Sequence, residues 1–180
     1  QIQLTGDQLA MLNTVFAKIL QNNLAQPRVL VHRDYHSRNL MLTTPNPGII
    51  DFQDAVSGPI TYDLVSLLKD AYIRWEEERI LDWAIRYWEK ARKAGLPVST
   101  DFAAFYRDFE WMGVQRHLKV LGIFARLNYR DGKAMYLNDM PLVMEYLRKA
   151  CERYIELKPL LDLLDAIHPA MPDRTIGYTF

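Results

Sequence analysis

The sequence predicts an α+β fold that is mostly helical, with short strands confined to the first third of the chain. After about residue 60, apolar residues recur three and four positions apart, which is the spacing of amphipathic helices. Near residues 30 and 50, two short apolar runs are bounded by turn-forming residues, which is typical of strands. With 180 residues and 49% hydrophobic content, the chain can bury a sizeable core as one domain.

The predicted strands border a polar segment that carries most of the chemistry. Arg28-Val29-Leu30-Val31 is a short β-branched and apolar run that enters this segment. Leu40-Met41-Leu42 and Gly48-Ile49-Ile50 follow it and flank the turn-forming residues 43–47. We therefore expect an antiparallel hairpin directly after the polar segment.

The turn of this hairpin predicts which residues lie opposite one another. Paired residues of an antiparallel hairpin have numbers with a constant sum, so a turn centred on Pro45 places Asn39 opposite Asp51. Residues 55–59 contain a Gly-Pro pair and are expected to form a brief turn-rich link. Asp63 then lies near the start of an apolar helix.

The remaining chain is expected to be helical. A capping box of Thr5 and Gln8 should open the first helix, which we expect to pack beneath the polar segment. Its predicted apolar stripe consists of Leu9, Leu12, Phe16 and Ile19. Further helices are expected over residues 76–93, 101–128 and 139–157, and an extended end is expected over residues 169–180.

His32-Arg33-Asp34, followed by Asn39 five residues after the aspartate, matches the catalytic loop of kinases. In phosphoryl transfer the protein positions an acceptor hydroxyl and neutralises developing charge with a metal ion. Asp34 is predicted to accept the proton of that hydroxyl or to orient it. Asn39 and Asp51 are predicted to hold a Mg²⁺ that also binds the phosphates of ATP.

Four other residues are predicted to assist these three. His32 is expected to be structural, and the Asp63 carboxylate is expected to brace backbone amides of the loop. His36 and Arg38 are candidate donors to the transferring phosphoryl group. The alternatives are a solvent-facing turn histidine at position 36 and an ion pair between Arg38 and the acidic turn that begins at Asp54.

The short distance between Asp51 and the next helix predicts the class of acceptor. Protein kinases need a long activation segment that ends in Ala-Pro-Glu, and residues 52–61 leave no room for one. The loop therefore predicts a small-molecule acceptor rather than a protein.

Residues 32–40, 50–55 and 58–64 resemble the aminoglycoside phosphotransferase family, which has a protein-kinase-like fold. Within it, residues 35–38 and 113–124 are most similar to the bacterial kinases of cell-wall recycling that phosphorylate N-acetylmuramate and N-acetylglucosamine. The resemblance implies a phosphotransferase with an alcohol group as acceptor, ATP as co-substrate and Mg²⁺ as cofactor. By the same resemblance, the acceptor is the anomeric hydroxyl and the product is a sugar 1-phosphate that feeds peptidoglycan recycling.

Members of this family also have an N-terminal lobe, in which a glycine-rich loop and a strand lysine hold the nucleotide. All eight glycines of this chain stand singly, and no lysine follows a Val-Ala-Ile type of strand. The resemblance therefore implies that residues 1–180 form a C-terminal lobe for catalysis and substrate binding, with the nucleotide-binding lobe upstream. We expect this piece alone to be inactive.

Four side chains are candidate contacts to the sugar: Tyr35, Glu110, Trp111 and Arg116. Glu110 would hydrogen-bond sugar hydroxyls, while Trp111 would either stack on a sugar face or belong to the core. The Arg116 guanidinium suits the lactyl carboxylate of N-acetylmuramate, and the alternatives are a surface arginine or an internal salt bridge.

Composition excludes several other classes of protein. Lys plus Arg equals Asp plus Glu at 22 each, so the chain lacks the positive charge expected of a nucleic-acid binder. Cys151 is the single cysteine, and no apolar stretch of about twenty residues suits a membrane span. We expect a cytoplasmic protein whose partners are a sugar and ATP, with neither nucleic acid nor membrane.

Two other functions remain open. An aminoglycoside or other amino-alcohol (choline-like) kinase would use the same Asp34, Asn39 and Asp51, but cationic acceptors favour acids where Arg116 and Lys119 stand. From a different class comes a non-catalytic binding module that keeps a kinase-shaped pocket.

Overall fold

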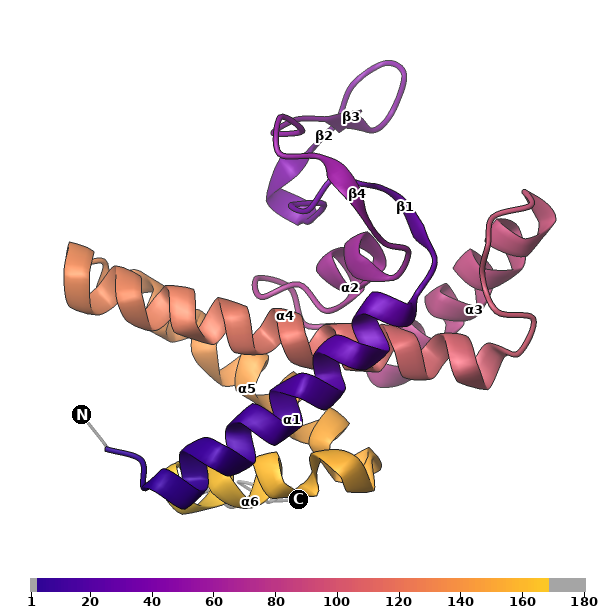
Figure 1. Cartoon of the computed structure of the whole chain (residues 1–180). Helices are drawn as coiled ribbons and strands as arrows, with labels where there is room; N and C mark the ends of the chain where they lie inside the picture. Colours follow the sequence, from indigo (N-terminus) through magenta and orange to yellow (C-terminus); the bar gives the residue numbers. More distant parts are fainter. Residues whose placement is uncertain (1–2, 169–180) are drawn as a thin grey trace, which may run out of the picture.

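The computed structural model describes residues 3–168, so the extended end expected over residues 169–180 lies outside the described residues. Figure 1 shows a mainly helical molecule with its strands gathered on one side. The helices are α1 (Gly6–Ala25), α2 (Tyr62–Leu68), α3 (Glu77–Lys93), α4 (Phe102–Asp131), α5 (Met140–Arg153) and α6 (Lys158–Ile167). The strands are β1 (Arg28–Val31), β2 (Leu40–Met41), β3 (Gly48–Ile49) and β4 (Val56–Pro59), and 3₁₀ turns cover Ser37–Asn39, Ala134–Asp139 and Ile155–Leu157.

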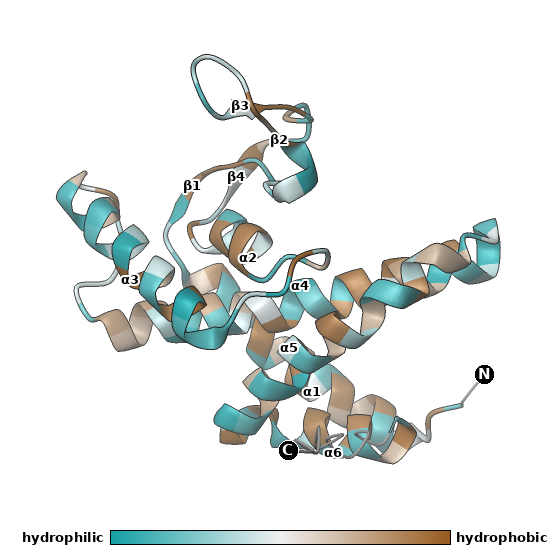
Figure 2. Ribbon diagram, turned by 180° about the vertical axis from the view of Figure 1, so that it is seen from behind, coloured by the Kyte–Doolittle hydropathy of each residue, from teal (hydrophilic) through white to brown (hydrophobic). Residues whose placement is uncertain are grey.

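The helix α4 runs through the middle of the molecule and contributes to both hydrophobic clusters (Figure 1). One cluster joins it to α1, α5 and α6 through buried residues such as Val114 and Leu147. The other joins it to α2 and α3 through Phe109, Val65 and Ala84. Because each helix is apolar on one side, packing around a shared central helix removes most of these stripes from water. Figure 2 shows hydrophobic residues concentrated along α2 and where the larger helices meet.

The first helix begins at the predicted residue, but the side that it buries differs from the predicted stripe. Thr5 and Gln8 form the expected capping box, with Gln8 N donating to Thr5 Oγ1 and Thr5 N donating to Gln8 Oε1. Its buried apolar residues are Val15 and Ile19, whereas Phe16 is exposed. The helix packs on α4 and α6, so the expectation that it lies beneath the polar segment is wrong.

The strand β1 has the predicted bounds, and its partner is β4, within residues that the sequence analysis assigned to a turn-rich link. Val29 pairs with Gly58 in an antiparallel ladder. A Cβ atom at position 58 would stand 2.6 Å from a methyl group of Val31, so glycine is required for this close approach. The Gly-Pro pair therefore marks a tight strand pairing rather than a loop.

The hairpin of β2 and β3 forms, but its register differs by one from the prediction. Leu40 pairs with Ile49, and the Ile50 amide donates to the Asn39 carbonyl at 3.2 Å. The centre of the turn therefore lies between Thr44 and Pro45, which moves Asp51 off the position opposite Asn39. Within residues 3–168, no helix combines the length and hydropathy that a membrane span requires.

Candidate active site

The first half of the polar segment is fixed by one carboxylate on α2. Asp63 accepts hydrogen bonds from the backbone amides of His32, at 2.6 Å, and Arg33, at 3.0 Å. Arg33 has a φ of 76°, in the left-handed region that costs energy for residues other than glycine. The charged acceptor on its amide helps to hold this conformation, which turns the chain sharply just before Asp34.

The ring of His32 links the loop to the hairpin. Its Nδ1 accepts a hydrogen bond from the Asp34 amide at 3.3 Å, and its Nε2 lies 2.9 Å from the Ile50 carbonyl oxygen. An acceptor at Nδ1 and a donor at Nε2 describe one tautomer of the neutral imidazole. Both ring nitrogens of His32 therefore make structural contacts, and one of these contacts is to Ile50, the residue that precedes Asp51.

Asp34, Asn39 and Asp51 come together through the side chain of Asn39. Its Nδ2 donates to the Asp34 carbonyl at 2.9 Å and to Asp51 Oδ2 at 3.3 Å. Gln53 Nε2 donates to the other carboxylate oxygen of Asp51 at 2.6 Å. Asp51 has a φ of 65°, and this left-handed turn, rather than the hairpin ladder, brings its side chain back to Asn39.

These residues fit a magnesium ion better than a transition metal. The part of the chain that the structure describes has no cluster of three His, Cys, Asp or Glu side chains that could hold a metal alone. Asn39 and Asp51 supply hard oxygen donors on an exposed edge, and amide nitrogens contact both carboxylate oxygens of Asp51. Mg²⁺ is commonly held by one or two protein oxygens together with phosphates and water.

A cavity of about 160 Å³ opens beside the loop and is lined by Asp34, His36 and Arg116, among others. Arg116 is largely buried, and its Nη1 donates to the Arg33 carbonyl at 3.3 Å. Lys119 adds a second cationic side chain to the lining and donates to the Tyr62 hydroxyl at 3.4 Å. The cavity therefore places positive charge close to the predicted base.

His36 lines this cavity with a partly buried ring. Burial lowers its pKa below the ordinary value of 6.5, with Asp70 acting against the shift and Arg116 adding to it. Its Nδ1 is buried and has no hydrogen-bond partner among the described residues. A buried ring nitrogen without a partner is costly, so this atom is suited to a hydrogen bond with a bound substrate.

The other predicted loop residues have different surroundings. Arg38 lies over the ring of Tyr72, 3.4 Å from its centroid, in a cation–π contact rather than an ion pair with Asp54. Tyr35 packs edge-on against the ring of His32, with centroids 5.9 Å apart. Tyr35 is not among the residues that line the cavity.

Besides Tyr35, two further predicted sugar contacts do not line this cavity, so Arg116 is the one of the four that does. Trp111 is buried in the helical core, where its ring meets Tyr154 edge-on. Glu110 is 1% exposed, pairs with Lys69 at 3.4 Å and with Arg153, and accepts from the Tyr154 hydroxyl at 2.9 Å. The structure does not support sugar contacts at Glu110 or Trp111, because both side chains are turned into the protein.

Several lining residues were missed by the sequence analysis. Asp70 and His117 are almost fully buried and line the cavity, and Lys69 does so while paired to Glu110. The available signal was the polar pair Lys69-Asp70 directly after the apolar run of α2, where a solvent-exposed helix end would be the simplest reading. His117 gave no signal, because a histidine on an apolar helix is usually a core residue.

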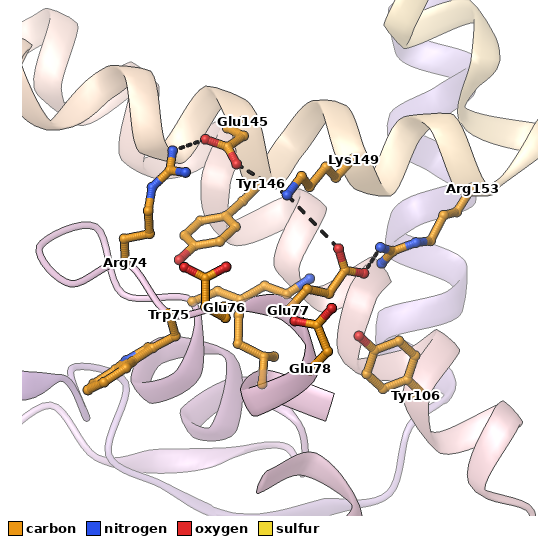
Figure 3. A pocket seen from close by; sticks show the side chains of 12 residues that line it. Arg74, Trp75, Glu76, Glu77, Glu78, Tyr106, Glu145, Tyr146, Lys149 and Arg153 are labelled. Atoms are coloured by element: carbon orange, nitrogen blue, oxygen red, sulfur yellow. Dashed lines mark hydrogen bonds and ion pairs between the residues drawn. The ribbon is translucent and has the colours of Figure 1, made fainter. Parts of the chain in front are cut away.

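A second cavity, of about 230 Å³, shares Lys69 with the first but includes none of the loop residues (Figure 3). Figure 3 shows acidic and basic side chains from α5 and from the start of α3 facing one another across it. Exposed ion pairs of this kind stabilise little individually. We assign this cavity to the ion pairs that join the start of α3 to α5. The pairs are Arg74–Glu145, Lys149–Glu145, Lys149–Glu77 and Arg153–Glu77.

Comparison with known proteins agrees with the motifs of the loop. Curated relatives named N-acetylmuramate/N-acetylglucosamine kinase include proteins from Neisseria meningitidis, at 60% identity over 90% of this chain, and Pseudomonas putida, at 51% over 89%. The relative of that name from Pseudomonas aeruginosa is 49% identical over 92% of the chain. These alignments cover 48%, 47% and 49% of the relatives, so the chain spans about half the length of the curated relatives it matches.

The family model described as the phosphotransferase enzyme family matches residues 2–98, which contain the whole polar segment together with Asp51 and Asp63. This match and the identities of the relatives confirm the resemblance seen in the sequence, and the chain belongs to the phosphotransferase enzyme family.

Proposed function

We propose that the full-length protein is a kinase that transfers the γ-phosphate of ATP to the anomeric hydroxyl of N-acetylmuramate or N-acetylglucosamine. The observation that carries the proposal is the Asn39 side chain, which contacts both the Asp34 carbonyl and the Asp51 carboxylate, while Asp34 itself lines a small cavity with cationic walls. The names of the relatives support the choice of acceptor. Residues 1–180 would contribute the catalytic half, and the family resemblance implies a nucleotide-binding lobe upstream.

In this mechanism the acceptor hydroxyl lies in the cavity beside Asp34. The Asp34 carboxylate orients the hydroxyl and takes its proton as the new P–O bond forms and the bond between the γ-phosphorus and ADP breaks. His36 donates from its ring to the phosphoryl group, and Arg38 adds positive charge nearby. His32 and Asp63 keep the backbone of the loop in place.

Asn39 and Asp51 would hold Mg²⁺, which when bound neutralises charge on the phosphates of ATP. The Asn39 side-chain amide also donates a hydrogen bond to the Asp34 carbonyl. This hydrogen bond connects the proposed metal site to the backbone of the predicted base. This coupling keeps the position of the proton acceptor tied to the position of the nucleotide phosphates.

Arg116 is the residue that favours an anionic acceptor over a cationic one. Its guanidinium lines the cavity and would pair with the lactyl carboxylate of N-acetylmuramate, with Lys119 close by. The same two cations oppose an aminoglycoside or choline, since a positively charged acceptor would meet like charge on entry.

The test is ADP release by the full-length protein with ATP, Mg²⁺ and each of four acceptors: N-acetylmuramate, N-acetylglucosamine, kanamycin and choline. Turnover with the two sugars and sugar 1-phosphate as product is the expected result. Turnover with kanamycin or choline, but with neither sugar, would show that the acceptor is cationic and would contradict the proposal. Nucleotide binding without turnover of any acceptor would favour a non-catalytic module.

A further inference from the structure

We propose that Asp70 is a positioning residue of the phosphotransfer site, which fixes the second half of the catalytic loop as Asp63 fixes the first. Its action is indirect: by holding Ser37 and Tyr72, it sets the places of the Asp34 carboxylate and the His36 ring. The inference rests on the proposed function in that Asp34 is taken as the proton acceptor.

The Asp70 carboxylate is buried and accepts hydrogen bonds from two backbone amides and one hydroxyl. The residue is 3% exposed. Its Oδ2 accepts from the Ser37 amide at 3.1 Å and from the Ser37 hydroxyl at 2.5 Å, and its Oδ1 accepts from the Tyr72 amide at 3.2 Å. Hydrogen bonds to a charged acceptor are about twice as strong as neutral ones, and a buried carboxylate without them is very unfavourable. The conformations at Ser37 and Asp70 are therefore strongly coupled.

The two carboxylates stand at opposite ends of α2. Asp63 lies in its first turn, and Asp70 lies two residues beyond its last residue, Leu68. Between them, Val65 is fully buried in the cluster shared with α4. The loop is thus held at two points, near Arg33 by Asp63 and at Ser37 by Asp70, and the helix between these two carboxylates is anchored in the core. Asp34 and His36 lie between these two points along the chain.

Asp70 also orders the aromatic ring on which the loop side chains rest. It bonds the Tyr72 amide, and the Tyr72 ring meets His36 edge-on at 5.8 Å and lies beneath Arg38 at 3.4 Å between centres. Both candidate donors to the phosphoryl group therefore pack on a residue that Asp70 holds. Displacement of reacting groups by about 1 Å can cost about a hundredfold in rate, so such an anchor is important for turnover.

A direct role is the alternative, because Asp70 also lines the cavity with Asp34 and Arg116. A residue that hydrogen-bonds the sugar changes the KM for the sugar when it is replaced. A residue that positions the loop lowers kcat and leaves that KM nearly unchanged. The two roles therefore give different kinetics.

The variants are Ser37→Ala, Asp70→Asn and the double variant, made in the full-length protein. Ser37→Ala deletes the hydroxyl and keeps the hydrogen bond from the backbone amide of residue 37 to Asp70. It therefore tests the contact without threatening the fold. Asp82→Asn is the matched control, because its carboxylate is exposed on α3 and pairs with Arg86.

Hydrogen exchange of the peptide spanning residues 32–39 tests the bracing independently of any substrate. Asp70→Asn should accelerate exchange of this peptide by about tenfold or more, because the Ser37 amide loses its charged acceptor. The Asp82→Asn protein should match wild type. Unchanged exchange in Asp70→Asn would overturn the proposal even if the sugar kinase activity is found.

Steady-state kinetics use ATP and the acceptor that the wild-type protein phosphorylates. Asp70→Asn should lower kcat by at least about tenfold and Ser37→Ala by about threefold, with the KM for the acceptor within about threefold of wild type. The double variant should match Asp70→Asn, because both changes break the same contact. A raised KM with normal kcat would assign Asp70 to acceptor binding and overturn the positioning role. If wild type phosphorylates no acceptor, the proposed function fails while the exchange result still decides the bracing.

Discussion

Asn39 and Asp51 contact each other through their side chains, with Nδ2 of Asn39 standing 3.3 Å from Oδ2 of Asp51, although the hairpin backbone pairs Asn39 with Ile50. The left-handed conformation of Asp51 makes this contact possible, because it turns the carboxylate back toward the hairpin. Two oxygen-bearing side chains at the open end of the hairpin, one just before β2 and one after β3, thus meet beside the Asp34 carbonyl.

The first prediction concerns this pair. Asp51→Asn keeps the shape of the side chain but removes its charge, so the Mg²⁺ concentration for half-maximal activity should rise and kcat should fall at least about a hundredfold. A magnesium titration of the full-length protein measures both. Asp54→Asn is the control and should behave as wild type, since Asp54 is exposed three residues further along. Equal magnesium dependence in wild type and Asp51→Asn would remove Asp51 from the metal site.

The second prediction isolates the proton acceptor. Asp34→Asn should lower kcat by at least about a hundredfold, because the amide cannot take the proton of the hydroxyl. The hydrogen bonds of Asp34 to His32 and Asn39 run through its backbone, so thermal unfolding of the variant should match wild type. Near-normal kcat in a folded Asp34→Asn protein would exclude it from the chemistry.

The sequence was informative where local chemistry determines local structure. The β-branched run Arg28–Val31 is a strand with the predicted bounds, and Thr5 with Gln8 forms the predicted capping box. Both depend on residues close together in the chain. The spacing between Asp34 and Asn39 identified the loop because phosphoryl transfer requires those residue types in one segment.

The sequence was less informative where contacts between residues far apart in the chain determine the structure. The strand β4 was read as a link because Gly58 and Pro59 usually interrupt strands, and only the side chain of Val31 explains the glycine. Asp70 was not singled out from the sequence, because its partner Ser37 lies 33 residues earlier. The half-residue shift of the turn centre could not be read from the turn-forming residues, which are compatible with either register.

The third prediction tests the buried ion pair between Lys69 and Glu110, a residue that the sequence analysis had predicted to contact the sugar. Glu110→Gln leaves the buried Lys69 without its charge partner and should lower the free energy of unfolding by about 3 kcal/mol. Urea unfolding of the full-length protein measures this change. For comparison, Asp82→Asn breaks an exposed pair with Arg86 and should cost less than about 1 kcal/mol. Equal effects of the two substitutions would show that Glu110 is not a buried partner of Lys69.

The last prediction concerns acid sensitivity. Burial, with Lys69 as the next contribution, lowers the pKa of His117 from 6.5 to about 3, so the folded protein keeps this ring neutral while the unfolded chain protonates it below 6.5. The unfolded state then binds more protons, and the stability from this group is full above pH 6.5 and is lost progressively as the pH falls toward 3.

His117→Gln removes that linkage. Between pH 6.5 and 5 the free energy of unfolding of wild type should fall by roughly 1.5 kcal/mol more than that of His117→Gln, measured by urea unfolding at each pH. His168→Gln, at the exposed end of α6, should follow wild type across the same range. Parallel curves for wild type and His117→Gln would mean that water or a shifted helix lets His117 protonate in the folded protein, because only then do the folded and unfolded states bind this proton equally.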